Sequence, residues 1–203
     1  MDEENIIIPT NIAYTSCILQ NNIEQLKKKY RFLRIGNIGY SVLGKPIPYI
    51  KIGNGTNEVM YSASIHANEW ITSVVLMKFV ENFCKAYEKN EKIYGYSARE
   101  IFNKSSIYIV PMVNPDGVDL VTGVIPENTG RYNQFKDISL NFPSIPFPSG
   151  WKANFNGVDL NLQFPAGWLN AKRIKFAQGY TRAISKRFCG IRTFNRARSI
   201  STI

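Results

Sequence analysis

The spacing of apolar residues in the N-terminal third of the chain predicts one helix followed by a strand hairpin. Apolar side chains recur near one face of residues 16–30, and Thr15 or Ser16 can cap the start of such a helix. Two shorter runs, residues 35–43 and 47–52, have the composition of strands. A Gly-Lys-Pro sequence separates these runs, so we expect them to pair as a hairpin.

Two continuous apolar runs further along the chain have the pattern of buried strands. Residues 58–65 and 106–113 form these runs. Residues 69–87 lie between them and carry the apolar side of a helix, and residues 97–102 are compatible with a second, short helix. Solid apolar strands that alternate with helices are typical of parallel sheets. The pattern therefore predicts an α/β fold with a largely parallel sheet.

Polar residues directly follow each of these runs. His66 stands at the end of the first run, and the turn sequence Asn-Pro-Asp-Gly at 114–117 follows the second. Sites in such sheets gather where strands end, so we expect a site near His66 and Asp116. Residues 123–168 are rich in Pro, Asn, Gly and aromatic residues, and we expect them to form an ordered, functional loop region.

The net charge of +10 is concentrated at the C-terminal end of the chain. Residues 180–203 contain no acid and six cations, which leaves +4 for all preceding residues. The six cations are Arg182, Lys186, Arg187, Arg192, Arg196 and Arg198. Because the excess charge belongs to a tail and says little about the domain, its distribution argues against a nucleic-acid partner.

Length, hydropathy and cysteine usage are those of a single globular domain without a membrane span or a disulfide framework. Its 203 residues suit one domain, and no apolar run is long enough to span a bilayer. The start of the chain, residues 1–4, is acidic, whereas a secretory signal begins with basic residues, so we expect a cytoplasmic location. Cys17, Cys84 and Cys189 share no metal-like spacing and do not suggest a disulfide framework.

The strongest functional signal is a set of three motifs in order. Alone, the single histidine His66 and a carboxylate three residues later at Glu69 are weak evidence for a metal site. The run Ser-Ile-His-Ala-Asn-Glu-Trp at 64–70 is, however, followed by the motif at 114–117 and by Gly-Val-Asp-Leu-Asn-Leu-Gln-Phe-Pro at 157–165. This order and spacing resembles the zinc carboxypeptidase (metallocarboxypeptidase) family.

The residues after the third motif narrow the resemblance to one branch of that family. Ala-Gly-Trp at 166–168 and Lys-Phe-Ala-Gln-Gly at 175–179 resemble the bacterial γ-D-glutamyl-L-diamino acid endopeptidases, which cut cell-wall peptides. The resemblance covers about residues 15–180. It implies the N-terminal part of a zinc-carboxypeptidase-like mixed, largely parallel sheet flanked by helices and incomplete at the C-terminus.

The resemblance also implies a role for five residues and a Zn²⁺ cofactor. His66 and Glu69 match two zinc ligands of a site that leaves one position open. Asp159 matches the carboxylate that hydrogen-bonds the first zinc histidine, although it could simply be a turn residue. Asn161 matches a substrate-binding asparagine. Lys152 falls near the position of an oxyanion-stabilising arginine, and a solvated loop lysine is an equal alternative.

One departure from the family pattern bears on the substrate. Ordinary carboxypeptidases have an arginine after the asparagine to clamp a C-terminal carboxylate, and here that residue is Leu162. Leucine cannot make a bidentate contact with a carboxylate. The departure agrees with the endopeptidase branch, so the expected substrate is a cell-wall muropeptide.

Two parts of the family mechanism have no counterpart in this sequence. The third zinc ligand is a histidine and the general base a glutamate near the C-terminus, yet the chain has no second histidine and no acid after Asp159. We therefore assign no catalytic residue and expect an incomplete zinc site, weak zinc binding and no peptidase activity.

The C-terminal tail suggests a reason for this loss. The resemblance stops near Tyr180. Codons for residues 186–190 and 192–199, shifted by one base, can read Lys-Asp-Phe-Val-Gly and Gly-Pro-Leu-Thr-Glu-Pro-Glu-Ala, which resemble the family. Our hypothesis divides the chain into an N-terminal extension (1–14), a partial zinc peptidase domain (15–180) and a basic, out-of-frame tail (181–203).

Three classes of function remain open. The first is a zinc peptidase that hydrolyses γ-D-glutamyl-diamino acid bonds of peptidoglycan, inactive in this truncated form. The second is a zinc carboxypeptidase or an amidoacid deacylase, which share the His-x-x-Glu pair. The third is a non-catalytic basic binding protein. The motifs at 114–117 and 160–163 favour the peptidase.

Overall fold

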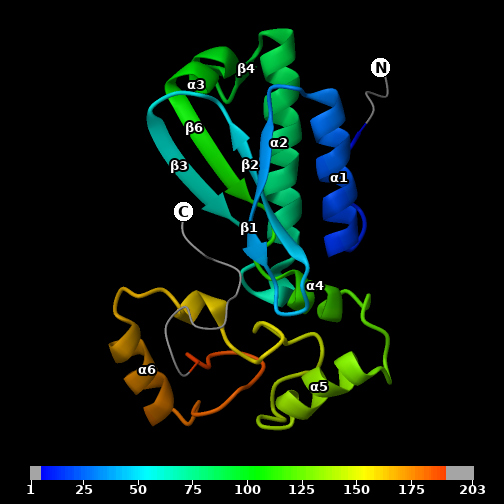
Figure 1. Ribbon diagram of the computed structural model, residues 1–203, viewed down its shortest axis with the longest axis vertical. Coiled ribbons are helices and arrows are strands. Elements are labelled where there is room, and N and C mark those ends of the chain that lie inside the picture. The colour runs from blue at the N-terminus through cyan, green and yellow to red at the C-terminus, as the bar shows by residue number, and fades with distance from the viewer. Residues whose placement is uncertain (1–5, 191–203) are drawn as a thin grey trace.

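The computed structural model describes residues 6–190 and divides them into two halves (Figure 1). One half holds a four-stranded sheet with two long helices, and the other holds short helices and loops. In chain order, the elements are α1 (Ser16–Lys29), β1 (Arg34–Tyr40), β2 (Pro46–Ile52), β3 (Asn57–Ser62), the 3-10 turn η1 (Ala67–Glu69), α2 (Ile71–Lys89), β4 (Lys92–Ile93), β5 (Tyr96–Ser97), α3 (Ala98–Lys104), β6 (Ser105–Val110), α4 (Pro115–Val121), α5 (Gly130–Ser139), η2 (Leu160–Leu162) and α6 (Trp168–Ala177).

The first helix forms for the reasons that its sequence suggests. The hydroxyl of Thr15 accepts a hydrogen bond from the backbone N–H of Ile18 at 3.2 Å and caps the start of α1. Leu19, Ile23 and Leu26 recur on its buried face. The predicted helix and its cap are confirmed.

The sheet is mixed, with the strand order β1-β2-β6-β3. β1 pairs with β2 and β2 with β6 in antiparallel fashion, whereas β3 pairs with β6 in parallel. The expected mixed α/β fold with flanking helices is confirmed. Of the three pairings between these four described strands only one is parallel, because the β1–β2 hairpin adds an antiparallel edge to the β3–α2–β6 crossover unit.

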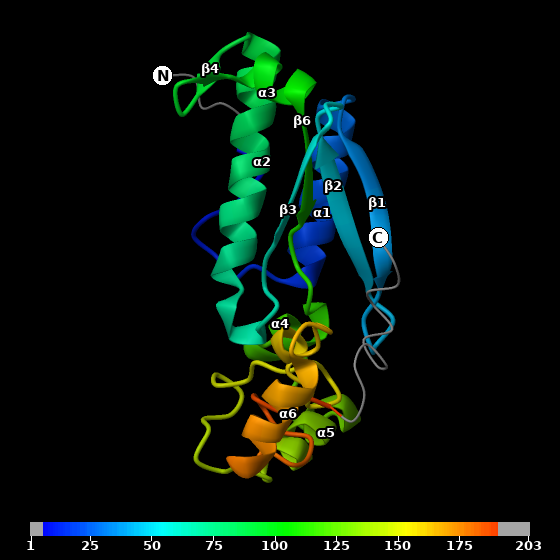
Figure 2. The ribbon, with the colours of Figure 1, turned by 90° about the vertical axis from the view of Figure 1, so that its left-hand side faces the viewer.

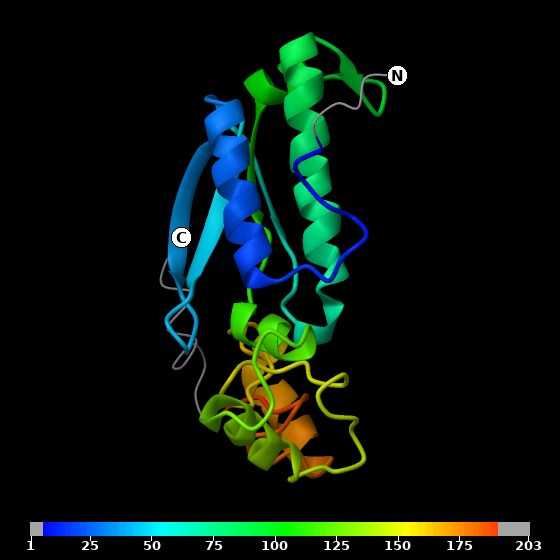
Figure 3. The same cartoon turned by 90° about the vertical axis from the view of Figure 1, so that its right-hand side faces the viewer.

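Both long helices lie on the same face of the sheet (Figures 2 and 3). Their buried side chains form one core with residues from β2 and β6. Strand residues of this core are Ile50, Ile52, Ile107 and Ile109. β3 and β6 run toward the half of the molecule that contains α4, α5 and α6, so their ends deliver the following residues to the junction of the two halves (Figure 1).

The prediction of a buried strand at residues 58–65 is wrong. The strand β3 is shorter, and all six of its residues are exposed, including Val59 at 41%, Met60 at 51% and Tyr61 at 50%. β3 is the edge of the sheet within residues 6–190, so no further described strand pairs with its outer side. An apolar composition alone does not reveal whether anything covers a strand.

The sequence at 114–117 begins a helix instead of forming a simple turn. The side chain of Asn114 accepts a hydrogen bond from the N–H of Gly117 at 3.2 Å, and Pro115 occupies the first helical position of α4. The loop-rich residues 123–168 include α5, and they pack through an edge-to-face contact of Phe135 and Trp151, with ring centroids 4.9 Å apart.

Part of the proposed tail is packed against the rest of the domain. Ile184 and Phe188 are buried with Ile145, and the carbonyl of Ser185 accepts hydrogen bonds from the backbone N–H groups of Lys152 and Ala153, both at 2.8 Å. Residues 191–203 of that tail lie outside the described residues. The boundary at residue 181 stays a prediction. No helix within residues 6–190 is both long and apolar enough to cross a membrane.

Candidate metal site

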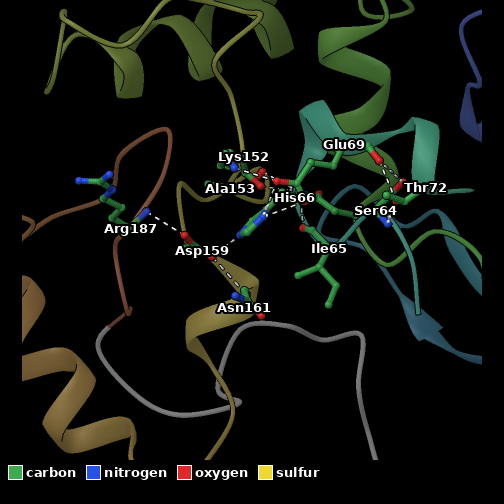
Figure 4. A network of polar contacts seen from close by, with 11 residues as sticks. Ser64, Ile65, His66, Glu69, Thr72, Lys152, Ala153, Asp159, Asn161 and Arg187 are labelled. Atoms are coloured by element: carbon green, nitrogen blue, oxygen red, sulfur yellow. Dashed lines mark hydrogen bonds and ion pairs between the residues drawn. The ribbon is translucent and has the colours of Figure 1, made fainter. Parts of the chain in front are cut away.

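The site is built on the short turn that joins β3 to α2. His66 has an extended backbone and precedes the 3-10 turn η1, which ends at Glu69. This geometry turns both side chains toward each other, and Nδ1 of His66 lies 3.1 Å from each carboxylate oxygen of Glu69 (Figure 4). The imidazole is mostly buried, with 18% of its side chain exposed, whereas 44% of the Glu69 side chain is exposed.

Asp159 approaches the same imidazole from the opposite side. Its Oδ1 lies 3.2 Å from Nε2 of His66, although 93 residues separate the two in sequence. The carboxylate is itself held by the backbone N–H groups of Arg187, at 2.9 Å, and Asn161, at 3.2 Å. The imidazole is thus fixed between two carboxylates, one at each ring nitrogen (Figure 4).

Lys152 brings a positive charge to the same group. Its Nζ donates a hydrogen bond to Oε1 of Glu69 at 2.8 Å. The loop that carries Lys152 is attached to the turn at residues 66–69. The N–H of Ala67 donates to the carbonyl of Lys152 and the N–H of Asn68 to that of Trp151, both at 3.2 Å. Lys152 therefore does not lie free on a loop surface.

Asn161 contributes differently from the other four residues. Its backbone N–H orients Asp159, and the residue is exposed next to the site. Its neighbour Leu162 is half-buried. The structure thus brings His66, Glu69, Lys152 and Asp159 into one hydrogen-bonded network and places the backbone of Asn161 at its edge.

Comparison with known proteins identifies the family to which this chain belongs. The sequence profile of the zinc carboxypeptidase family matches residues 19–198. The chain belongs to the zinc carboxypeptidase family.

Curated relatives and solved structures agree with this membership. The chain is 46% identical over 155 residues to "Gamma-D-glutamyl-L-diamino acid endopeptidase 1" of Lysinibacillus sphaericus, covering 76% of this chain and 38% of that protein. It is 38% identical over 157 residues to "Uncharacterized protein YqgT" of Bacillus subtilis (strain 168), covering 76% and 41%. The fold matches the crystal structure of thrombin activatable fibrinolysis inhibitor with a TM-score of 0.66 at 20% identity, covering 97% of this chain and 45% of that chain.

The chain spans about two fifths of the length of the curated relatives it matches. Its donor types suit the zinc on which the carboxypeptidase family depends, because imidazole nitrogen and carboxylate oxygen are ordinary zinc ligands. Within residues 6–190, however, no group of three or more His, Cys, Asp or Glu side chains is arranged to hold a metal ion. The described part of this zinc carboxypeptidase chain therefore offers a pair of donors and not a full ligand set.

The electrostatics of the pair also suit a cation between His66 and Glu69. The hydrogen bond with Asp159 is the largest influence on the pKa of His66 and raises it, burial opposes this effect, and the charges of Asp159 and Glu69 support it. Burial raises the pKa of Glu69, but Lys152 and His66 together hold that pKa below its ordinary value. Negative charge thus faces both sides of the imidazole, which favours a proton or a metal ion at Nδ1.

Sequence reasoning missed the groups that hold this network in place. The side-chain amide of Asn114 donates to the carbonyl of Ala153 at 2.8 Å and lies 3.3 and 3.4 Å from those of Lys152 and Ile65. The motif at 114–117 marked this position, but only as a turn. Arg187 acts through its backbone, so no side-chain pattern could have revealed its contact with Asp159.

Proposed function

We propose that this chain carries the N-terminal part of the active site of a zinc peptidase that hydrolyses γ-D-glutamyl-diamino acid bonds in cell-wall peptides. The observation that supports the site most directly is the imidazole of His66 between Glu69 and Asp159. The substrate class rests on the 46% identity with the endopeptidase of Lysinibacillus sphaericus.

Each residue of the network has a role in this proposal. His66, through Nδ1, and Glu69 would hold the zinc ion, and Asp159 would keep the proton on Nε2 so that Nδ1 is free to bind. A bound zinc ion supplies a Lewis acid that polarises the scissile carbonyl group. Lys152 would place its ammonium group beside the oxygen that gains negative charge.

The residues after Asp159 bear on substrate choice. Asn161 is exposed beside Asp159 and is available to contact a polar group of the substrate. Leu162 cannot form the paired hydrogen bonds that an arginine makes with a terminal carboxylate. This supports a muropeptide as the substrate over the C-terminus of an ordinary peptide.

The 203 residues do not contain all the groups that the reaction needs. The chain has one histidine and no acid after Asp159, so a third zinc ligand and a general base would have to come from other residues. A polypeptide of these residues alone is expected to bind zinc weakly and to show no peptidase activity. We further propose that residues from about 181 onward are out of frame, which sequencing of the locus would test directly. The family profile matches residues as far as 198, so an uninterrupted reading frame through these codons would overturn this proposal.

A chimera tests the substrate class. Residues 1–180 would be joined to the part of the Lysinibacillus endopeptidase that follows its matched region. We expect the chimera to cleave a γ-D-glutamyl-diaminopimelate peptide, and the same chimera with His66→Ala to be inactive. Cleavage of N-acyl amino acids or of free C-terminal residues in preference to the γ-D-glutamyl bond would overturn the proposal.

A further inference from the structure

The turn that carries both proposed ligands is closed by a hydroxyl group outside the ligand set. The Oγ1 atom of Thr72 accepts a hydrogen bond from the backbone N–H of Ser64 at 2.9 Å and donates one to the carbonyl of Glu69 at 2.7 Å. It therefore joins the residue at the start of the turn to the residue at its end, and His66 lies between these two residues in the sequence (Figure 4).

Ser64 shows that this turn is held in an unfavourable shape. Its φ angle of 46° lies in the left-handed region, which residues other than glycine rarely adopt. Such a backbone persists only where surrounding contacts fix it. Here the hydroxyl of Ser64 contacts that of Ser73 at 2.6 Å, and its carbonyl accepts from the N–H of Asn114 at 3.0 Å.

The side chain of Glu69 needs such support more than that of His66 does. Asp159 holds the imidazole at Nε2, whereas the side chain of Glu69 is 44% exposed and its carboxylate also binds Lys152. The 3-10 turn itself offers one backbone hydrogen bond across this span, from Glu69 to His66 at 3.2 Å. The hydroxyl of Ser64 also donates to the carbonyl of Glu69, at 3.5 Å. The bond from Thr72 is the shortest of these three bonds to the Glu69 backbone.

We propose that Thr72 is a positioning residue for metal capture, whose hydroxyl sets the place of Glu69 relative to His66. The inference rests on the proposed zinc site. Thr72 would touch neither metal nor substrate, and it would act by keeping the two donors at the separation at which both can bind one ion. Hydrogen bonds that orient the ligating side chains directly change metal affinity by about 10–100-fold in other metal sites, and Thr72, which acts through the backbone of Glu69, is expected at the low end of that range.

The single histidine allows a direct test on the 203-residue chain. Its ring nitrogens give the only imidazole signals in a proton–nitrogen NMR spectrum, with and without added zinc. We expect Thr72→Val, which removes the hydroxyl, to shift these signals in the metal-free protein and to weaken zinc binding about tenfold. Thr72→Ser, which keeps the hydroxyl, should restore both within about twofold of the original chain.

Thr129→Val is the matched control, because the hydroxyl of Thr129 donates to a carbonyl three residues earlier, at 2.8 Å, at the start of α5. It should leave the His66 signals and zinc affinity unchanged. Unchanged signals and affinity in Thr72→Val, equal effects of Thr129→Val, or loss of folding in Thr72→Val would each overturn the inference. If the original chain binds no zinc at all, the weak zinc binding expected of it is refuted, and the metal-free ring signals still decide whether Thr72 positions the pair. Activity of the chimera tests the proposed function separately.

Discussion

Replacing Asn114 by alanine removes a side chain that connects three segments around the site. Asn114 is 2% exposed and lies at the start of α4. The side-chain oxygen of Asn114 accepts from the N–H of Gly117 and caps α4. Its side-chain nitrogen donates to the backbone carbonyl of Ala153 at 2.8 Å, beside Lys152. Alanine can make none of these contacts, so the N–H of Gly117 loses its side-chain partner, and the carbonyl of Ala153 keeps the hydrogen bond from the indole of Trp151 at 2.7 Å.

The expected cost follows from these two losses. Removing an N-cap side chain costs about 1 kcal/mol, and losing one further hydrogen bond costs about 0.5–1.5 kcal/mol, which together lower the free energy of unfolding by about 1.5–2.5 kcal/mol. For a chain of this length, about 2–4 °C per kcal/mol converts this into a fall in Tm of about 3–10 °C.

Urea and thermal unfolding, followed by tryptophan fluorescence, would measure this change. Asn170→Ala is the matched control, because Asn170 is exposed and its side chain accepts an exposed hydrogen bond from the guanidinium of Arg173 at 3.1 Å. The control should change the free energy of unfolding by less than about 0.5 kcal/mol. If Asn114→Ala changes the stability no more than the control does, the amide does not clamp these segments and the reasoning is refuted.

Three further predictions test the packing of α4, a buried carboxylate and the sheet edge. In Gly117→Ala the new Cβ would lie 2.7 Å from Cβ of Ala67, so thermal unfolding should show a loss of about 1–3 kcal/mol, whereas Gly130→Ala meets no atom within 4 Å and should be neutral or slightly stabilising. Burial raises the pKa of Glu81, but hydrogen bonds from Lys78 and a backbone N–H hold that pKa below its ordinary value overall. Glu81→Gln should lower the free energy of unfolding by about 1–3 kcal/mol at pH 7. Met60→Lys places a charge on the exposed edge strand β3 and should reduce aggregation in light scattering without lowering Tm.

The control outcomes for these variants are equally specific. A lowered folded pKa stabilises the protein above the ordinary glutamate pKa of 4.5 and loses that effect as the pH falls through the lowered value, so the cost of Glu81→Gln should shrink in acid. A pH-independent cost would contradict the ion pairing. Equal costs for the two glycine variants would contradict the close packing of α4 on η1. Unchanged aggregation of Met60→Lys would exclude the β3 edge as its cause.

Local sequence patterns were sufficient to predict helix α1 and the pair of residues at the centre of the candidate site. The cap and apolar face of α1 are encoded within one stretch of chain, so both could be predicted. The spacing of three residues between His66 and Glu69 places both side chains on one turn, which is again a local property. The three motifs in order were sufficient to indicate the zinc carboxypeptidase family.

The family resemblance implied the contact of Asp159 with His66, whereas the other distant contacts of this pair emerged from the three-dimensional packing alone. Asp159 reaches His66 across 93 residues, Lys152 reaches Glu69 across 83, and Asn114 clamps the loop between them. The exposure of β3 depends likewise on which other elements cover it. Helix caps and apolar periodicity depend on neighbouring residues, so a short stretch of sequence predicts them. Contacts between distant segments depend on how the whole chain packs, and no short sequence pattern predicts that packing.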